Sequence, residues 1–410
     1  MTLEASFAAV CTHLLGADFS EKLGVAVSGG GDSTALLVLA CGHFGADRVT
    51  ALSVDHGLRA EAKRELAQVA DLAAQLGCAY EVFTWNGWDQ RGNLQAEARA
   101  ARYRLMAEWG AQTGTDTIFL GHTGDDQAET VLMRLARGSG VDGLAAMQPL
   151  HVRNGVRWVR PLLEVGREEL RRFLLARGTV WSEDPTNEDE SFDRIRLRKM
   201  MPELAKIGLD RARLVQTAAH MARARSALRQ EVARLAAQSV QQQVGDLLIT
   251  RAAFDAAPRE LQSRLLAEAL RFISGQTYAP RYAALAALID AGGGTLHGAL
   301  VTSDAKSLRI TREAAALRSA DCGPDALFDN RWTLIGPMEP THRVRALEEA
   351  SLAQLEDWRT SGLPRASLAA SPAIWQGETL IAAPLAHFNP AWRAELVGNR
   401  ADFAAYLRDT

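Results

Sequence analysis

The sequence predicts an α/β fold: a doubly wound parallel sheet in the first domain, then an α-helical domain, then a small mixed domain at the C-terminus. Three observations support this order. Short β-rich runs alternate with longer helical runs between Gly24 and Gly121, helical periodicity dominates from about Leu204 to Leu288, and short β-like pieces separated by Gly and Pro follow. Apolar strands that alternate with amphipathic helices are typical of parallel βαβ units, whose helices cover both faces of a sheet.

The expected elements of the first domain follow one another at short intervals. The pattern predicts strands over 24–28, 48–54, 79–85 and 116–122, and helices from Ser33, over 61–76 and over 93–109. A further helix is expected over 165–178, followed by an exposed junction rich in Asp, Pro, Asn and Glu. We place the three domains at 1–205, 206–292 and 293–410.

Length and composition restrict the class of protein. A chain of 410 residues is long enough for two or three domains. No apolar stretch approaches the roughly 20 residues that cross a bilayer. The N-terminus carries no basic leader, so we expect a cytoplasmic protein without membrane contact. Four cysteines without a C-x-x-C pair predict neither a zinc site nor a disulfide framework. The formal net charge of −3 gives no global attraction for nucleic acid, and the sequence leaves a homodimer open.

The stretch "VAVSGGGDSTALLVLACG", from Val25 to Gly42, places three glycines and an aspartate between a buried strand and a helix. Without side chains, the backbone N–H groups can approach an anion closely, and the helix start adds about half a positive charge there. A plain glycine turn is the alternative. Asp32 tolerates phosphate only if Mg²⁺ lies between them, so it is the predicted metal ligand. The expected nucleotide-binding residues are Ser28, Gly29, Gly30, Gly31, Asp32 and Ser33.

The glycine loop does not fit the two commonest nucleotide-binding motifs. A P-loop kinase or GTPase needs a lysine that is missing here. A Rossmann fold needs another glycine spacing, although Asp55 lies after the second strand, at about the distance from the glycines where that fold has its acidic residue. "SGGGDS" instead resembles the S-G-G-x-D-S signature of the PP-loop ATP pyrophosphatase family. That resemblance implies cleavage of ATP between its α and β phosphates, with transfer of AMP to an acceptor.

Further stretches resemble one branch of that family, the tRNA(Ile)-lysidine synthetases. They are "SVDHGLR", "NLQAEARAARYRLM", "GHTGDDQAETVLMRLARGSGVDGLAAM", "RPLLEVGREELRRFL" and "EDPTNEDESF", with weaker similarity towards the C-terminus. The resemblance implies that the protein uses ATP and Mg²⁺ to adenylate C2 of cytidine 34 in the CAU anticodon of tRNA(Ile). L-lysine then replaces the adenylate through its ε-amine. The helical domain over 206–292 has little motif identity with the family. A protein that must distinguish one tRNA among many needs a surface that reads the shape of RNA stems, so this domain is the expected tRNA-binding domain.

The segment "HTGDDQAET" carries the predicted catalytic carboxylates. A helix that begins near Asp125 would bring Asp125, Asp126 and Glu129 together at its first turn, where they favour a cation. We expect Asp126 and Glu129 to bind lysine and, with His122 at the strand end, to take its proton. For Asp125 the alternative is a helix N-cap, and for Glu129 it is an exposed ion pair one turn along the helix.

Histidine and arginine residues complete the predicted site. Arg99 and Arg102 share one helix face and are expected to contact phosphate of ATP or tRNA, the alternative being a solvated face. His56, after the second strand, is expected in the adenosine pocket.

A second group of arginines, in "FDRIRLRK", is expected at the tRNA backbone: Arg194 and Arg196, with Arg198 beyond them. This segment matches the family pattern only loosely. The family's strand-end histidine is commonly doubled, whereas Thr123 stands in the second place here.

Three rival functions are open at this point. Thiolation of tRNA by the same ATP chemistry would need cysteines to carry sulfur or a cluster. Amide transfer to a small adenylated substrate, as in GMP or NAD synthetases, would release pyrophosphate without tRNA. A non-catalytic RNA-binding protein would keep its RNA affinity when Asp32 is changed to Ala.

Overall fold

A computed structural model describes residues 2–55, 57, 62–85, 94–183, 193–323 and 325–409. Contacts between Cα atoms divide the chain into two compact units, Met1–Arg225 and Ser226–Thr410. The division falls within helix α9 (Arg211–Ser239), and the three domains expected from the sequence stay a prediction. Within the described residues, no helix is both long and apolar enough to cross a membrane.

The first unit is built on a six-stranded sheet in the order β3-β2-β1-β4-β6-β5. All neighbouring pairs are parallel except β5 with β6, which form an antiparallel hairpin at the edge. The strands are β1 (Leu23–Ala26), β2 (Val49–Asp55), β3 (Ala79–Thr84), β4 (Thr117–Leu120), β5 (Leu150–Arg153) and β6 (Val156–Val159). The predicted doubly wound parallel sheet is confirmed.

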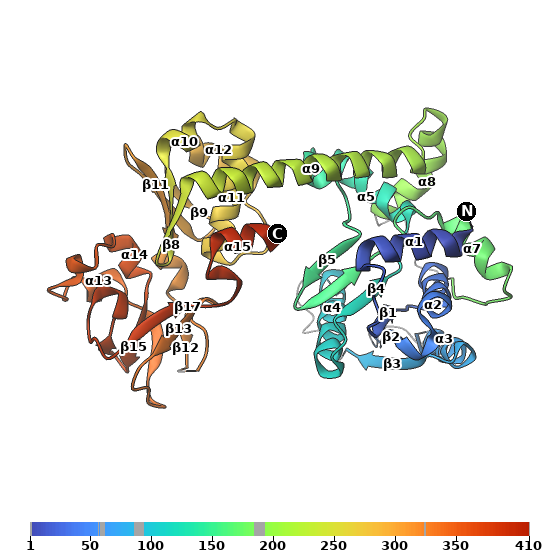
Figure 1. Cartoon of the computed structure of the whole chain (residues 1–410), viewed down its shortest axis with the longest axis horizontal. Helices are drawn as coiled ribbons and strands as arrows, with labels where there is room; N and C mark the ends of the chain where they lie inside the picture. Colours follow the sequence, from blue (N-terminus) through green and yellow to red (C-terminus); the bar gives the residue numbers. More distant parts are fainter. Residues whose placement is uncertain are drawn as a thin grey trace. The chain divides into compact units, whose positions relative to one another are not determined.

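Helices cover both faces of this sheet (Figure 1). Successive strand residues point to opposite faces, so Phe119 packs with α1, α2, α3 and α7, whereas Ile118 packs with α4. The helices of this unit are α1 (Leu3–Leu15), α2 (Gly31–Phe44), α3 (Ala62–Leu76), α4 (Leu94–Thr113), α5 (Gly124–Ala136), α6 (Val141–Leu144), α7 (Arg167–Leu175) and α8 (Asp193–Lys206), with a 3-10 turn η1 (Ala46–Arg48).

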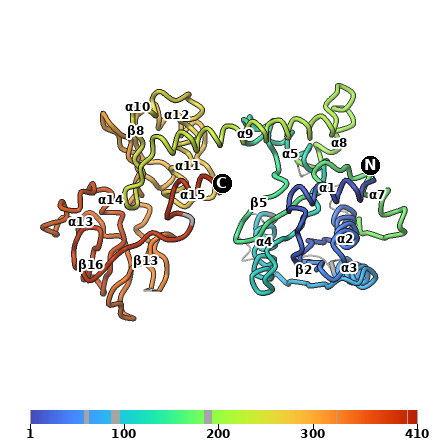
Figure 2. The backbone as a smooth tube through the Cα atoms, in the orientation of Figure 1, coloured from blue at the N-terminus to red at the C-terminus, as the bar shows by residue number. Residues whose placement is uncertain are grey.

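The strand order reverses between β1 and β4. From β1 the chain moves outward to β2 and β3, and it then returns to place β4 and β6 on the other side of β1. In open parallel sheets, ligands bind beyond the carboxyl ends of the strands where the order reverses. The tube in Figure 2 follows this path. The glycine loop after β1 and His122 after β4 therefore flank the place where the fold predicts a site.

The second unit begins with an antiparallel sheet in the order β7-β8-β11-β10-β9. Its strands are β7 (Val240–Gln243), β8 (Asp246–Thr250), β9 (Gly294–Leu296), β10 (Ala299–Ser303) and β11 (Ser307–Arg312). Helices α10 (Arg251–Ala256), α11 (Arg259–Ser274) and α12 (Tyr282–Asp290) lie between β8 and β9 in the chain, and α15 (Phe403–Asp409) returns to pack on α11.

The expectation that nearly all of the chain from about Leu204 to Leu288 is helical is wrong over β7 and β8. Val244 has a φ of +55°, and with Gly245 it forms a two-residue turn between Gln243 and Asp246. A positive φ at two-residue turns suits the right-handed twist of a hairpin and breaks a helix. The glutamines before the turn favour helix in isolation, and the pairing of β8 with β11 decides otherwise.

The rest of the second unit is a compact assembly of short elements, as the Gly and Pro spacing predicts. A four-stranded sheet has the order β12-β14-β15-β16, and β13 pairs with β17. The elements are η3 (Ala314–Leu317), β12 (Asp321–Cys322), β13 (Trp332–Ile335), β14 (Arg343–Ala346), α13 (Glu349–Leu352), η4 (Trp358–Ser361), α14 (Arg365–Ala369), β15 (Pro372–Gln376), β16 (Thr379–Ala382), η5 (Pro384–Ala386), β17 (Arg393–Leu396) and η6 (Gly398–Arg400).

Candidate active site

The glycine loop joins β1 to α2 in the conformation that an anion site requires. Gly29 has a φ of +87°, which side chains other than glycine rarely adopt. The Ser33 hydroxyl accepts from the Ser28 N–H at 3.2 Å and donates to the Gly30 carbonyl at 3.0 Å. These hydrogen bonds within the loop stabilise its conformation. No described side chain caps the start of α2. The first-turn amides therefore remain available to phosphate oxygens.

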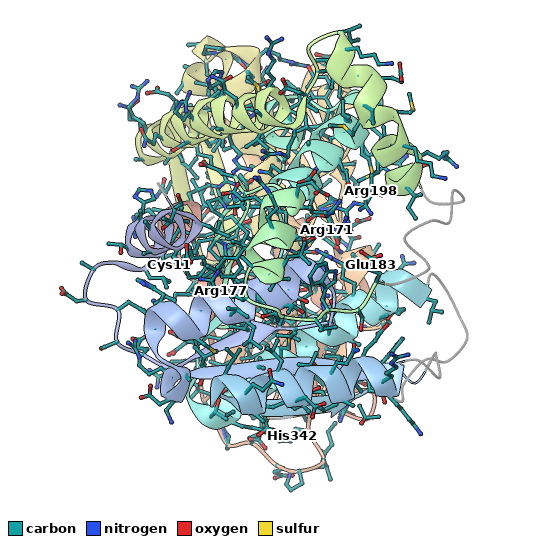
Figure 3. All side chains as sticks on the ribbon, turned by 90° about the vertical axis from the view of Figure 1, so that its right-hand side faces the viewer. Cys11, Arg171, Arg177, Glu183, Arg198 and His342 are labelled. Atoms are coloured by element: carbon teal, nitrogen blue, oxygen red, sulfur yellow. The ribbon has the colours of Figure 1, made fainter. Side chains whose placement is uncertain are left out.

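A segment from later in the chain closes the outer side of the loop. The Ser182 N–H donates to the Gly29 carbonyl at 2.9 Å, and the Ser182 hydroxyl hydrogen-bonds Gln68 of α3. A Cβ on Gly31 would lie 3.3 Å from the Trp181 ring, so glycine is needed there for close packing. Nearby on the exposed side, Arg171 and Glu183 form an ion pair at 3.4 Å (Figure 3).

Asp32 lies in the first turn of α2 and pairs with an arginine that the sequence did not single out. Its Oδ2 accepts from Arg167 Nε at 3.0 Å, and Oδ1 has no partner in the described residues. Burial raises the pKa of Asp32, Arg167 opposes that rise, and Asp126 and Asp125 add to it. The carboxylate is still 26% exposed, so it can receive a ligand.

Asp126 is fixed by the start of its own helix. Thr123 caps α5, and Asp126 accepts from the Thr123 N–H at 2.8 Å and hydroxyl at 3.0 Å. Its other oxygen accepts from Arg167 Nη2 at 2.6 Å. Burial opposes ionisation, but Arg167 and the Thr123 N–H hold the pKa of Asp126 below its usual value. Thr123, which departs from the family pattern, therefore orients the neighbouring carboxylate.

Glu129 is the most deeply buried of the predicted carboxylates, at 2% exposure. Its Oε1 accepts from Arg167 Nη1 at 3.1 Å and from Arg198 Nε at 3.0 Å. Arg198 extends from α8 (Figure 3), and Arg194, one turn earlier, places its Nε 3.8 Å from Oε2. The alternative of an exposed ion pair along α5 is thus excluded for Glu129.

Asp125 is not the N-cap of α5. Its Oδ2 accepts from the backbone N–H of Arg167 at 2.8 Å, at the first position of α7. Arg167 therefore donates to Asp125 from its backbone N–H, and its guanidinium contacts three further carboxylates. We call these three residues, Asp32, Asp126 and Glu129, the carboxylate cluster. Burial opposes the charge of Arg167, but Asp126, Glu129 and Asp32 together raise its pKa.

A second group of charged residues, the arginine cluster, surrounds Tyr103 of α4. It consists of Arg99, Arg102, Arg153 and Arg160. Arg99 Nη2 lies 3.4 Å from the phenol oxygen, and the guanidinium carbons of Arg99, Arg102 and Arg153 lie 5.3, 5.7 and 5.9 Å from the ring centre. Burial would raise the pKa of Tyr103, but Arg99, Arg160 and Arg102 hold it below the usual value.

Charges of both clusters act on the pKa of His122. Burial and Arg160 lower its pKa to about 3, and Asp126 opposes this only in part. Its Nδ1 is buried without a hydrogen-bond partner in the described residues. His122 is therefore neutral at pH 7, with a ring nitrogen free for a ligand.

Most of the predicted site residues meet at this edge of the sheet, with two exceptions. Arg196 lies on the other face of α8 from Arg194 and Arg198, and pairs with Asp193. His56 falls outside the described residues. Arg194 and Arg198 both face Glu129, because residues four apart share a helix face. Their contact with the tRNA backbone stays a prediction.

The sequence did not single out Arg160, Arg167 and Tyr103. Arg160 follows β6 directly, and Arg167 opens α7 a few residues later. The rule that residues after a strand line the site would have found both, had it been applied beyond residue 122. Tyr103 lies one position after Arg102 and gave no signal of its own.

The donor set suits a divalent cation held mainly by a nucleotide. No group of three or more His, Cys, Asp or Glu residues that could hold a metal ion occurs in the described part of the chain. Magnesium sites commonly use one or two carboxylates, with phosphate oxygens and water completing the octahedron. The free Oδ1 of Asp32, at the start of α2, fits that role.

Comparisons with known proteins bear on the family of the chain. The model of the PP-loop domain family matches residues 3–204. The tRNA(Ile)-lysidine synthase of Ruegeria pomeroyi is 44% identical over 393 residues, covering 94% of this chain and 94% of that protein. The enzyme of the same name from Wolbachia pipientis is 32% identical over 354 residues, covering 80% and 82%.

Among solved structures, the U34-tRNA thiolase NcsA from Methanococcus maripaludis is similar to this chain. It has a TM-score of 0.46 and 17% identity, with 53% of this chain and 79% of that chain covered. The extent and identity of the sequence matches decide the family: this chain belongs to the tRNA(Ile)-lysidine synthases, and its PP-loop domain makes it an ATP-using protein.

Proposed function

We propose that this protein joins L-lysine to C2 of cytidine 34 in the CAU anticodon of tRNA(Ile), with ATP converted to AMP and pyrophosphate. The name of its relatives points to this product. The observation that carries the proposal is the pairing of Asp32, at the glycine loop, with Arg167, which also holds Asp126 and Glu129. One arginine thus connects the nucleotide site to the predicted lysine site.

In the first step, the O2 oxygen of cytidine attacks the α-phosphorus of ATP, and the bond to the bridging oxygen of pyrophosphate breaks. The amides from Gly29 to Ser33 and the Ser28 hydroxyl hold the leaving pyrophosphate by position and charge. Asp32 would hold Mg²⁺ through Oδ1. The cation supplies neutralisation of the negative charge that develops on the phosphates.

In the second step, the ε-nitrogen of lysine attacks C2, and the bond from C2 to the oxygen of AMP breaks. We assign binding of the lysine ammonium to Asp126 and Glu129, which already hold a cation in the form of Arg167. The nucleophile must lose a proton, because a free amine has a pKa near 10.4.

His122 is the predicted acceptor of that proton, with its unpartnered Nδ1 as the receiving atom. In the ligand-free protein its pKa of about 3 makes it a weak base. Arg160, Arg99 and Arg102 contribute to this low value. Bound phosphate would neutralise these arginines and raise the pKa of His122 toward the range in which general bases work well.

The rival of tRNA thiolation gains no support from the cysteines. Cys11, Cys41 and Cys78 are buried in one hydrophobic core of the first unit, and Cys322 lies in the second unit. None is among the site residues described above. A cytoplasmic location, the use of Mg²⁺ and the oligomeric state stay predictions.

The proposed function is tested with labelled lysine, ATP, Mg²⁺ and two transcripts. We expect label in a tRNA(Ile) transcript with the CAU anticodon and none in a tRNA with another anticodon. Equal labelling of both transcripts, or none of either, would remove the proposal. Pyrophosphate release without any tRNA would instead favour amide transfer to a small substrate.

A further inference from the structure

The arginine cluster carries more positive charge than its surroundings balance. None of Arg99, Arg102, Arg153 and Arg160 has a carboxylate partner in the described residues. Buried arginines elsewhere in the chain do: Arg312 and Arg331 each lie 3.1 Å from Asp329. A buried charge without a counter-charge is costly, and this applies to Arg160 and to the partly buried Arg102. The arginine cluster as a whole therefore suits an anion.

Arg160 forms the buried base of the cluster. It is 7% exposed, and in the described part of the chain the partners of its Nη1 are neutral: the Gln148 carbonyl at 2.8 Å and His151 Nδ1 at 3.1 Å. The Nε atoms of Arg160 and Arg102 are buried, and they find no hydrogen-bond partner among the residues that the structure describes. Arg99 and Arg153 are exposed, which leaves the outer side of the cluster accessible.

The position of the cluster separates it from the phosphate site of the nucleotide. The glycine loop follows β1, whereas Arg160 follows β6 and His122 follows β4, which lies between them in the sheet. The amides and Asp32 already provide for the phosphates of ATP. A second anion must therefore come from the other substrate, whose reacting base has to reach the site between β1 and β4.

We propose that Arg99, Arg102 and Arg153, with the Tyr103 hydroxyl, bind a backbone phosphodiester of the RNA loop that carries the target cytidine. Arg160 is a positioning residue that adds fixed charge behind them. Guanidinium groups are well suited to contact phosphate oxygens in forked geometry. The ring of Tyr103 is itself buried against Trp158, so it positions the arginines around it and does not stack with a base. This inference rests on the proposed function, since it takes the acceptor to be an RNA loop.

The test measures binding of a synthetic anticodon stem–loop with the CAU sequence to the full-length protein at several salt concentrations. R153Q is compared with R157Q, a matched control four residues along the hairpin. Arg157 already forms ion pairs with Glu21 and, at 2.7 Å, with Asp116. These carboxylates balance its charge, so it should contribute little to RNA binding. Affinity for ATP without RNA is measured in parallel.

We expect R153Q to raise the Kd for the stem–loop several-fold and to reduce the slope of log K against log salt by about 0.7, the value for one contact to single-stranded RNA. R157Q should change neither, and ATP affinity should stay the same in both. Equal loss of RNA affinity in R153Q and R157Q would overturn the proposal. It would show that the affinity depends on the net charge of the protein and not on a contact made by the arginine cluster. Loss of ATP affinity alone would assign the cluster to the nucleotide instead.

R160Q and R160K examine the positioning role. R160Q should reduce the salt slope, and R160K, which keeps the charge, should restore it. If R160Q does not fold, R153Q alone decides the proposal. Failure of the proposed function would be seen separately, as a wild-type protein that binds the stem–loop but incorporates no lysine.

Discussion

Arg167 Nε lies 3.0 Å from Asp32 Oδ2, although the two residues are 135 positions apart in the chain. The contact joins the first turn of α7 to the first turn of α2, where the glycine loop ends. The same guanidinium contacts Asp126 and Glu129 of α5. Arg167 therefore fixes the distance between the carboxylate at the nucleotide loop and those assigned to lysine.

Replacement of Arg167 should disrupt the whole carboxylate cluster. In R167Q three carboxylates would face one another without their shared counter-charge. We expect lysidine formation to fall by about 100-fold, the scale on which small misplacements reduce catalysis, and the midpoint of thermal unfolding to drop. R172Q is the control, because Arg172 is exposed on α7 and, among the described residues, its side chain hydrogen-bonds only the Glu168 carbonyl. Equal activity in the two variants would show that Arg167 has no positioning role.

Arg198 and Arg196 should differ, although both were first expected at the tRNA backbone. Arg198 holds Glu129 at 3.0 Å, whereas Arg196 pairs with Asp193 at the surface. We expect R198Q to raise the KM for lysine by about tenfold, because the buried Glu129 loses a charged partner, and R196Q to leave it nearly unchanged. Steady-state kinetics with lysine varied at saturating ATP and tRNA would measure this. An unchanged lysine KM in R198Q would contradict the assignment of Glu129.

His122 should make the folded protein sensitive to acid. Its pKa is about 3 in the folded chain, against about 6.5 when unfolded. Between these values the unfolded chain binds the extra proton, so this contribution to stability is present above pH 6.5 and is lost as the pH falls toward 3. We expect urea unfolding at pH 7 and pH 5 to show a smaller acid loss in H122Q than in the wild type. The same pH dependence in both would mean that His122 titrates normally.

Gly121 should be needed for the approach of β4 to the glycine loop. A Cβ there would lie 3.0 Å from Ser33 Cα and 3.1 Å from Ser33 N. We expect G121A to displace the start of α2 and to weaken ATP binding by about tenfold or more. G42A is the control. Gly42 lies in α2 with open space around its Cβ position, and alanine there should stabilise α2 by about 0.5–1 kcal/mol. Titration of ATP and thermal unfolding would separate the two effects.

The sequence predicts the parallel sheet and the glycine loop because both depend on local patterns. Apolar runs of strand length alternate with helices, and three glycines mark the turn after β1. It also brings His122, Asp126 and Glu129 to one place, because spacing along a single helix start is enough to do so. These parts of the site need no knowledge of distant contacts.

The partners of those residues could not be read from the sequence in the same way. The contacts of Arg167 and Arg198 depend on where α7 and α8 pack, and packing of separate helices leaves no period in the sequence. The hairpin of β7 and β8 was missed for a similar reason, since β11, which fixes it, lies more than 50 residues later. Arg160 and Arg167, which follow β6, are the part of the site that the sequence does indicate, because residues after a parallel strand tend to line a ligand site.

The most direct measurement of the central claim is pyrophosphate release from ATP in the presence of the CAU-anticodon tRNA(Ile) transcript and Mg²⁺, without lysine. Our account predicts release by the wild type, release near the uncatalysed level by D32N, and unchanged stability of that variant. Release by D32N at the wild-type rate would contradict the account, as would wild-type release that is independent of the transcript.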